Sequence, residues 1–369
     1  MSTGTSKDFD IIVIGAGIAG ASVAAHLAGA QRVAICEMED RPGYHTTGRS
    51  AAMYEPNYGS PPMLALTRAA GPEFWAGGFL TKRDTMFFAP PEQDRQFQRL
   101  MGFQKGMREI SVAEARRRFP YLAEGYAKWA VLDEHTADID VDALHQHYLK
   151  LFRQRGGEMH CDHAVTALEK NGQWTVRTKG ETLRSRIIVD AAGAWGDVVA
   201  EMAGRKKIGL QPKRRSMAVV PGPEGEDFMR WPMVGDVGET WYCKPQSGKL
   251  LISPAEATPV DPHDAYADDM TLAEGIARFS EAVNYEVTRV ERTWGGLRSF
   301  APDGCPVVGY DRKNDGFFWL IGQGGYGIQS SPALSRLAAA LVRGDAPPTD
   351  IMDEGLVLAE ISPERFSTA

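Results

Sequence analysis

The stretch Asp10-Ile11-Ile12-Val13-Ile14-Gly15-Ala16-Gly17-Ile18-Ala19-Gly20 decides the fold of this 369-residue chain. An apolar run ends at a Gly-x-Gly-x-x-Gly pattern, and an alanine-rich run to Leu27 follows. The first run predicts a buried strand and the second predicts a helix. A second apolar strand is predicted from Arg32 to Cys36. Together they form a strand–helix–strand unit that starts a parallel sheet.

The three glycines of this pattern have different predicted roles. Gly15 permits a tight turn, Gly17 lets the backbone approach a pyrophosphate, and Gly20 lets the helix pack closely on the strand. The free N–H groups of the helix start favour phosphate. Glu37, at the end of the second strand, is expected to accept hydrogen bonds from ribose hydroxyls and to disfavour NADP. The pattern predicts a dinucleotide but does not separate FAD from NAD, and a glycine-rich turn without a ligand is the alternative.

Two later segments favour FAD. The apolar run Ile187 to Ala191 predicts a buried strand, and the small residues Ala192 and Gly193 behind it allow close approach of a cofactor. The glycine-rich turn Gly322 to Gly327 opens a closing helix predicted over Pro332 to Val342. A helix start there would stabilise the negative charge that a flavin gains on reduction. A plain loop-to-helix connection remains possible on this segment alone.

Composition excludes several classes of protein. Charged residues make up 24% of the chain and the net charge is −7, with only short basic runs, which argues against nucleic-acid binding. The four cysteines have the spacing of neither a disulfide framework nor a zinc site, and we predict no metal and a cytoplasmic location. The N-terminal stretch MSTGTSKDFD does not resemble a signal peptide, and we expect no transmembrane segment.

The remaining pattern predicts a mixed α/β (α+β) fold. Helices are predicted over 63–75, 112–118, 142–155, the residues up to 202, and 270–282; strands over 158–186 with a turn at Asn171-Gly172, and over 217–220, 240–244, 250–252 and 317–321. We expect a Rossmann-type FAD-binding domain from residues 1–80, 142–210 and 300–369. A second, β-sheet-rich substrate-binding domain would comprise 81–141 and 211–299.

Several motifs together resemble the D-amino acid oxidase superfamily, which includes glycine oxidase and sarcosine oxidase. They are the Gly-x-Gly-x-x-Gly pattern, His45 to Ala52, Ala191 to Trp195, Gly296-Leu297-Arg298-Ser299-Phe300 and the terminal glycine turn, in that order. Within the superfamily the chain most resembles the bacterial FAD-dependent D-arginine dehydrogenases. That likeness includes Ala137-Asp138-Ile139-Asp140, Leu210 to Ser216 and Trp231-Pro232-Met233, and it runs over nearly the whole chain.

The resemblance implies non-covalently bound FAD and a set of residues that contact it. These are Gly15, Gly17, Ile18, Ala19, Gly20, Glu37, Thr47, Gly48, Arg49, Ser50, Ala51, Ala52, Val165, Ala192, Gly193, Trp195, Gly324, Gly325, Tyr326, Gly327, Ile328 and Gln329.

The resemblance also implies a substrate site. Arg298 would hold the substrate carboxylate with its two-pronged guanidinium. Tyr242 would donate its hydroxyl to the same carboxylate, and Tyr58 and Arg215 would line the pocket. On the residues alone, Arg298 in a structural salt bridge and the two tyrosines as packed core residues remain alternatives.

Two departures bear on the substrate. Thr85 stands where D-arginine dehydrogenase has a glutamate that holds the basic side chain, and Met53 stands where it has a histidine. A threonine cannot compensate a buried guanidinium. Because Met86, Phe87 and Trp241 add apolar surface nearby, we predict a neutral or hydrophobic D-amino acid.

The expected reaction is oxidative deamination by hydride transfer from Cα to flavin N5. Water then releases a 2-oxo acid and ammonia. The amine must first lose a proton, to His45 or to water. Secondary amines such as sarcosine, proline or opines are the alternative substrates, and an NAD-binding or non-catalytic flavin module is the alternative class. The acceptor is a quinone or oxygen, and both a monomer and a homodimer stay open.

Overall fold

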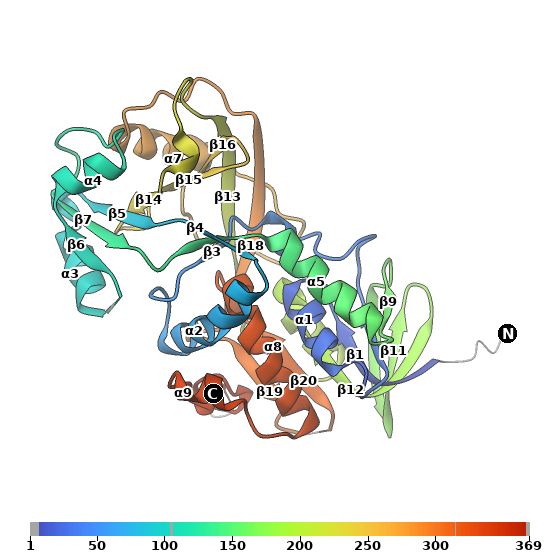
Figure 1. The fold of residues 1–369 in the computed structure, drawn as a ribbon. Coiled ribbons are helices and arrows are strands. Elements are labelled where there is room, and N and C mark those ends of the chain that lie inside the picture. Colours follow the sequence, from blue (N-terminus) through green and yellow to red (C-terminus); the bar gives the residue numbers. More distant parts are fainter. Residues whose placement is uncertain (1–6, 104–105, 314, 367–369) are drawn as a thin grey trace.

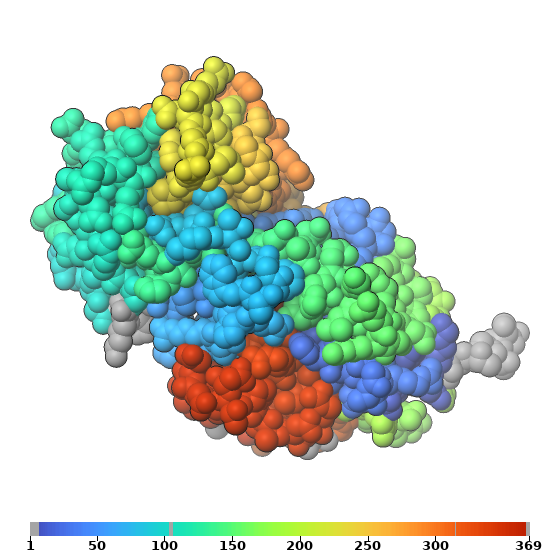
Figure 2. Space-filling view, in the orientation of Figure 1, coloured from blue at the N-terminus to red at the C-terminus, as the bar shows by residue number. Residues whose placement is uncertain are grey.

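The computed structural model describes residues 7–103, 106–313 and 315–366 (Figure 1). Residues 1–6, which precede the first strand, lie outside the described residues. Two lobes are visible in Figure 2. Segments around residues 90–130 and 210–300 form one lobe, and the N-terminal, 140–200 and C-terminal segments form the other.

The lobe that contains the N-terminal segment is built on an eight-stranded sheet. Its parallel core runs β9-β2-β1-β12-β20, with β10, β11 and β19 added antiparallel. The strands are β1 Lys7–Ile14, β2 Val33–Cys36, β9 Glu158–His160, β10 Val165–Asn171, β11 Gln173–Thr178, β12 Thr182–Asp190, β19 Val307–Tyr310 and β20 Phe317–Ile321.

Both faces of this sheet are buried, which explains the continuous apolar runs of its central strands. Alternation along β1 sends Ile11 and Val13 to one face and Ile12 and Ile14 to the other. The first face is covered by α1 Ile18–Leu27, α2 Pro61–Ala76, α5 Val141–Gln154 and α8 Gly327–Arg343, and α6 Gly196–Met202 lies on the second.

The second lobe is built on a ten-stranded, mostly antiparallel sheet ordered β21-β18-β13-β16-β15-β14-β5-β7-β6, with β17 beside β13. Helix α7 Asp269–Ala282 covers one face. The strands are β5 Thr85–Ala89, β6 Arg108–Ile110, β7 Trp129–Asp133, β13 Gln211–Pro221, β14 Met233–Asp236, β15 Tyr242–Gln246, β16 Lys249–Ser253, β17 Thr258–Pro259, β18 Arg292–Phe300 and β21 Gln323–Gly324.

A third, small sheet has three strands. It is formed by β3 Met53–Tyr54, β8 Ala137–Ile139 and β4 Leu80–Lys82. The other helices are α3 Asp94–Phe103, α4 Val112–Arg118 and α9 Thr349–Asp353. None of the helices in the described part of the chain is long and apolar enough to cross a membrane.

The predicted fold class is confirmed: an α/β body of Rossmann type stands beside a sheet-rich one. All the predicted helices are present, and the turn at Asn171-Gly172 joins β10 to β11. The elements that were not predicted are helices α3 and α9 and strands β3, β4, β5, β6, β7, β8, β14, β17, β18, β19 and β21. In β18 the pair Gly295-Gly296 hides the strand signal, since glycine weakens strand propensity. The division into two discontinuous domains stays a prediction.

Candidate active site

One large cavity connects the two lobes. Its wall is formed by the β1–α1 turn, the end of β2, the segment 43–58, residues 191–202, strands of the ten-stranded sheet and the turn that opens α8. Nearly all the predicted site residues lie on this wall; Gly20, Gly48 and Thr85 do not. Parts that are far apart in the sequence therefore meet at one site.

Gly15 and Gly20 fit the roles expected of them. Gly15 has φ +101°, and a Cβ there would lie 2.6 Å from the Ala191 carbonyl oxygen. A Cβ on Gly20 would lie 1.9 Å from the Gly15 carbonyl oxygen. Gly20 is thus required for packing of α1 on β1 and does not face the cavity. Gly48 is similar, because its Cβ would meet the Gly43 carbonyl oxygen at 2.6 Å.

The start of α1 faces the cavity with few side-chain obstructions. Gly17 precedes the helix, and Gly17, Ile18 and Ala19 line the wall. The Thr47 hydroxyl accepts the Ile18 N–H at 3.0 Å, which ties the predicted flavin-contact segment to the helix start. The remaining N–H groups and the positive end of the helix suit a diphosphate.

Glu37 is held in place at the end of β2. One carboxylate oxygen accepts the Ala16 N–H at 2.7 Å and the other accepts the Glu39 N–H at 3.0 Å. A carboxylate has about four lone-pair positions, so oxygen lone pairs remain for ribose hydroxyls. The side chain lines the cavity where the dinucleotide fingerprint places the adenosine.

Arg49 links the cofactor segment to the substrate lobe. Its guanidinium donates to the Ala265 carbonyl at 2.7 Å and to the Gly295 carbonyl at 3.2 Å, and it pairs with Asp264. The hydrogen bond from Arg49 lowers the pKa of the Asp264 carboxyl. Arg49 therefore binds both the loop of Asp264 and Ala265 and strand β18, and it also lines the cavity.

The pairing of β13 with β18 builds the opposite wall. Arg215 lies opposite Gly296 and Lys213 opposite Arg298, so Arg215 and Arg298 project from the same face. Gly296 leaves space beside the two cations. Arg298 also lies directly against Gly325, where a Cβ would be 2.4 Å from its Nε. β21 pairs with β18 on the next residues, Ser299 with Gly324 and Phe300 with Gln323.

The guanidinium of Arg298 faces the cavity without an acidic partner. Among the described residues, no carboxylate lies within ion-pair distance of it. Burial and the neighbouring Arg215 lower its pKa, while Tyr58, Tyr326 and Tyr242 oppose the shift. The structural salt bridge considered as an alternative is thus not found in the described residues.

The two predicted site tyrosines differ in their partners. The Tyr242 hydroxyl is 3.3 Å from the Met217 sulfur, a weak acceptor, and remains available to a ligand. The Tyr58 hydroxyl donates to the Glu239 carboxylate. Burial raises the pKa of Tyr58 well above its usual value, which keeps this hydroxyl protonated.

Glu55 and Lys244 are among the ionisable wall residues that the sequence analysis missed. Glu55 faces the cavity, its backbone N–H donates to the Gln329 side-chain oxygen at 3.0 Å, and burial raises its pKa to about 7. Lys244 is almost fully buried, and its ammonium lies 2.7 Å from Asp138. Alternation from Tyr242 along one strand could have indicated Lys244. No local pattern marks Glu55, which follows a two-residue strand.

The structure differs from the sequence-based expectation at three residues. Thr85 is fully buried in β5 and absent from the wall, whereas Phe87 of the same strand lines it. Met86 points into the core of the ten-stranded sheet. His45 does line the cavity, but its Nε2 lies 2.8 Å from Glu39, which follows the adenosine-side Glu37. This ring nitrogen of His45 is therefore already paired with a carboxylate.

A Rossmann-type sheet whose glycine turn opens on a cavity shared with a second sheet defines a dinucleotide-dependent oxidoreductase. The chain matches the family model described as "FAD dependent oxidoreductase" (DAO) over residues 10–341. It therefore belongs to this family, and its cofactor is FAD. The glycine cradle, the open start of α1 and the placement of Glu37 fit this group.

Curated relatives and solved structures extend the comparison. The hydrogen cyanide synthase subunit HcnC of Pseudomonas aeruginosa is 26% identical over 230 residues, 60% of this chain and 52% of that protein. The chain spans about half the length of this relative. Glycine oxidase from Geobacillus kaustophilus has a TM-score of 0.81 at 23% identity, covering 92% of this chain and 96% of that one. L-proline dehydrogenase from P. horikoshii has a TM-score of 0.84 at 20% identity, covering 98% and 99%.

Proposed function

We propose that this enzyme oxidises the carbon–nitrogen bond of a free amino acid, specifically a D-amino acid with a neutral or hydrophobic side chain. The FAD held by the glycine turn and the start of α1 would supply the acceptor for the hydride that leaves Cα. The resulting imine takes up water and releases a 2-oxo acid and ammonia. The D configuration rests on the resemblance of the motifs to those of D-arginine dehydrogenase.

The observation that carries the proposal is the guanidinium of Arg298, which has no carboxylate partner in the described part of the chain. A desolvated arginine without a carboxylate partner is costly, and an anionic ligand would remove that cost. A substrate carboxylate matches the guanidinium in charge and in two-pronged geometry. The Tyr242 hydroxyl, whose one hydrogen-bond partner among the described residues is the Met217 sulfur, would supply a further donor. Fixing the carboxylate orients the rest of the substrate, which is a large part of catalysis in such sites.

Glu55 supplies the base that the sequence analysis could not identify. It faces the same cavity as Arg298, and Arg298 and Lys244 act on its pKa. The carboxylate of Asp133 and that of Glu239 oppose them, and burial dominates. With a pKa of about 7, Glu55 could accept the proton that the substrate ammonium must lose before oxidation. In this proposal the Glu55 carboxylate interacts with the amine of the substrate and not with the substrate side chain.

The side-chain preference rests on the apolar part of the wall. Met53, Phe87, Met217 and Met233 line it at the substrate end. The names of glycine oxidase and L-proline dehydrogenase refer to amino acids without a charged side chain. These observations support an amino acid substrate whose side chain is not charged.

Anaerobic flavin bleaching tests this function. The FAD-loaded enzyme is mixed with D- and L-forms of alanine, leucine, phenylalanine and arginine, and with glycine, sarcosine and proline. We expect fast bleaching by neutral D-amino acids and slow bleaching by D-arginine. Bleaching by L-forms alone, or by sarcosine and proline alone, would overturn the proposed substrate. No bleaching by any amine would overturn the reaction itself.

A further inference from the structure

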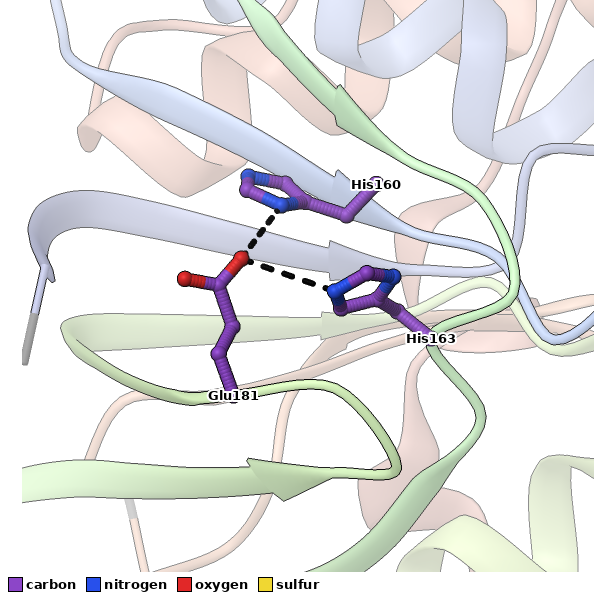
Figure 3. Close-up of side chains that lie close together, drawn as sticks. All are labelled: His160, His163 and Glu181. Atoms are coloured by element: carbon purple, nitrogen blue, oxygen red, sulfur yellow. Dashed lines mark ion pairs between the residues drawn. The ribbon is translucent and has the colours of Figure 1, made fainter. Parts of the chain in front are cut away.

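A cluster of two histidines and a glutamate lies outside the FAD cavity. Figure 3 shows the rings of His160 and His163 and the carboxylate of Glu181 pointing toward one another. His160 ends β9, His163 lies in the loop after it, and Glu181 lies in the turn before β12. None of the three lines the cavity. We propose that they form a binding site for a divalent transition metal, Zn²⁺.

The ligand atoms are already assembled. One atom from each residue can be chosen so that all lie within 4.8 Å of one another. His160 Nδ1 is 2.8 Å and His163 Nε2 is 3.6 Å from the same oxygen of Glu181. Ligands about 2.0–2.2 Å from a tetrahedral zinc lie roughly 3.3 Å apart. The observed separations lie on both sides of that value, so small side-chain rotations would admit the ion.

The loop sets the tautomer of His163. Its Nδ1 is 2.6 Å from the Cys161 carbonyl oxygen, so Nδ1–H donates there and the lone pair is left on Nε2, toward Glu181. A metal-bound histidine usually donates its other ring N–H to a carbonyl or carboxylate oxygen in this way. Asp162 has φ +59° and turns the chain between the two rings. Without an ion or an added proton, the Nε2 lone pair faces a carboxylate oxygen with no hydrogen between them.

Surrounding charges favour a cation. The second oxygen of Glu181 faces the Lys7 ammonium at 3.8 Å, which leaves the first oxygen for the two rings. His160 Nε2 is buried with no hydrogen-bond partner in the described residues and lies 3.9 Å from Glu158. Two glutamates, one lysine and two neutral imidazoles carry a net negative charge. Two imidazoles and a carboxylate are a ligand set that zinc accepts.

Calorimetric titration of the FAD-loaded enzyme with ZnCl₂ tests the site, together with zinc-edge X-ray absorption. We expect one ion per chain with nitrogen and oxygen ligands and no sulfur. Both His163→Gln and Glu181→Gln should weaken binding at least tenfold. His263→Gln is the matched control, because His263 makes the same bond to the carbonyl two residues before it. It should bind like the wild type.

Gly180→Ala removes no ligand but should also weaken binding, because the new Cβ would lie 2.4 Å from His163 Nε2. Circular dichroism and FAD content confirm that each variant is folded. The absence of saturable zinc binding, or equal binding by wild type, His163→Gln and Glu181→Gln, would overturn the proposal. These readouts do not depend on amino acid oxidation.

Discussion

At its dinucleotide end the cavity is built from backbone groups and glycines of contiguous segments, whereas its substrate end is built from side chains that separate strands bring together. Gly15, Gly17 and the start of α1 follow each other in the chain. Arg298, Tyr242 and Glu55 come from β18, β15 and a segment after β3. The first kind of site depends on local conformation and the second on the register of a sheet. Four changes test how far this difference extends.

The largest effect is expected at the dinucleotide end. In Gly20→Ala the new Cβ would lie 1.9 Å from a backbone oxygen that cannot move without displacing the Gly15 turn. We expect loss of bound FAD and therefore of all activity, measured by the visible absorbance of the purified protein. Gly102→Ala, where a Cβ meets nothing within 4 Å, is the control and should keep its flavin. A Gly20→Ala enzyme that retains its full complement of bound FAD would contradict the packing argument.

Arg298→Leu should damage only the substrate end. Loss of a desolvated charge pair costs about 2–5 kcal/mol, so we expect kcat/KM to fall by roughly 10²–10³-fold with FAD content unchanged. Arg292→Leu, on an exposed position of the same strand, should change kcat/KM little. If turnover survives in Arg298→Leu, the carboxylate is held elsewhere.

Glu55→Gln should lower kcat/KM by about 10²-fold, the contribution of a general base at the low end. In the wild type kcat/KM should rise with pH through about 7, and the variant should lack that step. The folded chain holds this proton up to about pH 7 and the unfolded chain releases it near 4.5. Glu55 should therefore contribute a fall in the free energy of unfolding as pH rises through this window, and the variant should lack this contribution. An unchanged pH profile would exclude Glu55 as the base.

Thr85→Val gives the smallest expected effect. The Thr85 hydroxyl is fully buried and has no hydrogen-bond partner in the described residues. Removing it should leave the enzyme as stable as the wild type or more stable by up to about 1 kcal/mol. Denaturant unfolding measures this, and substrate preference should not change. A shift in side-chain preference would restore Thr85 to the substrate site.

These comparisons explain what could be predicted from sequence. The β1–α1 unit, Glu37 and the helix start at α8 were predicted because each is specified by neighbouring residues. The resemblance added Arg298, Arg215 and Tyr242, and the register of β13 and β18 brings the two arginines to one face. The position of Glu55 on the wall and the burial of Thr85 could not be predicted from neighbouring residues, because strand pairing decides which side chain reaches the wall. The histidine cluster depends on the left-handed turn at Asp162, which no sequence pattern indicated.

The backbone hydrogen bonds that pair β21 with β18 have a consequence for how such an enzyme acquires new substrates. It ties the turn of Gly325 and Tyr326 to the strand of Arg298. A replacement at Gly325 would displace the anchor itself. The segment of residues 51–60 runs along the same cavity, and apart from β3 it is not paired with another strand. Laboratory selection for altered substrate preference should therefore accumulate changes in this segment, at positions other than Glu55, and spare Gly325.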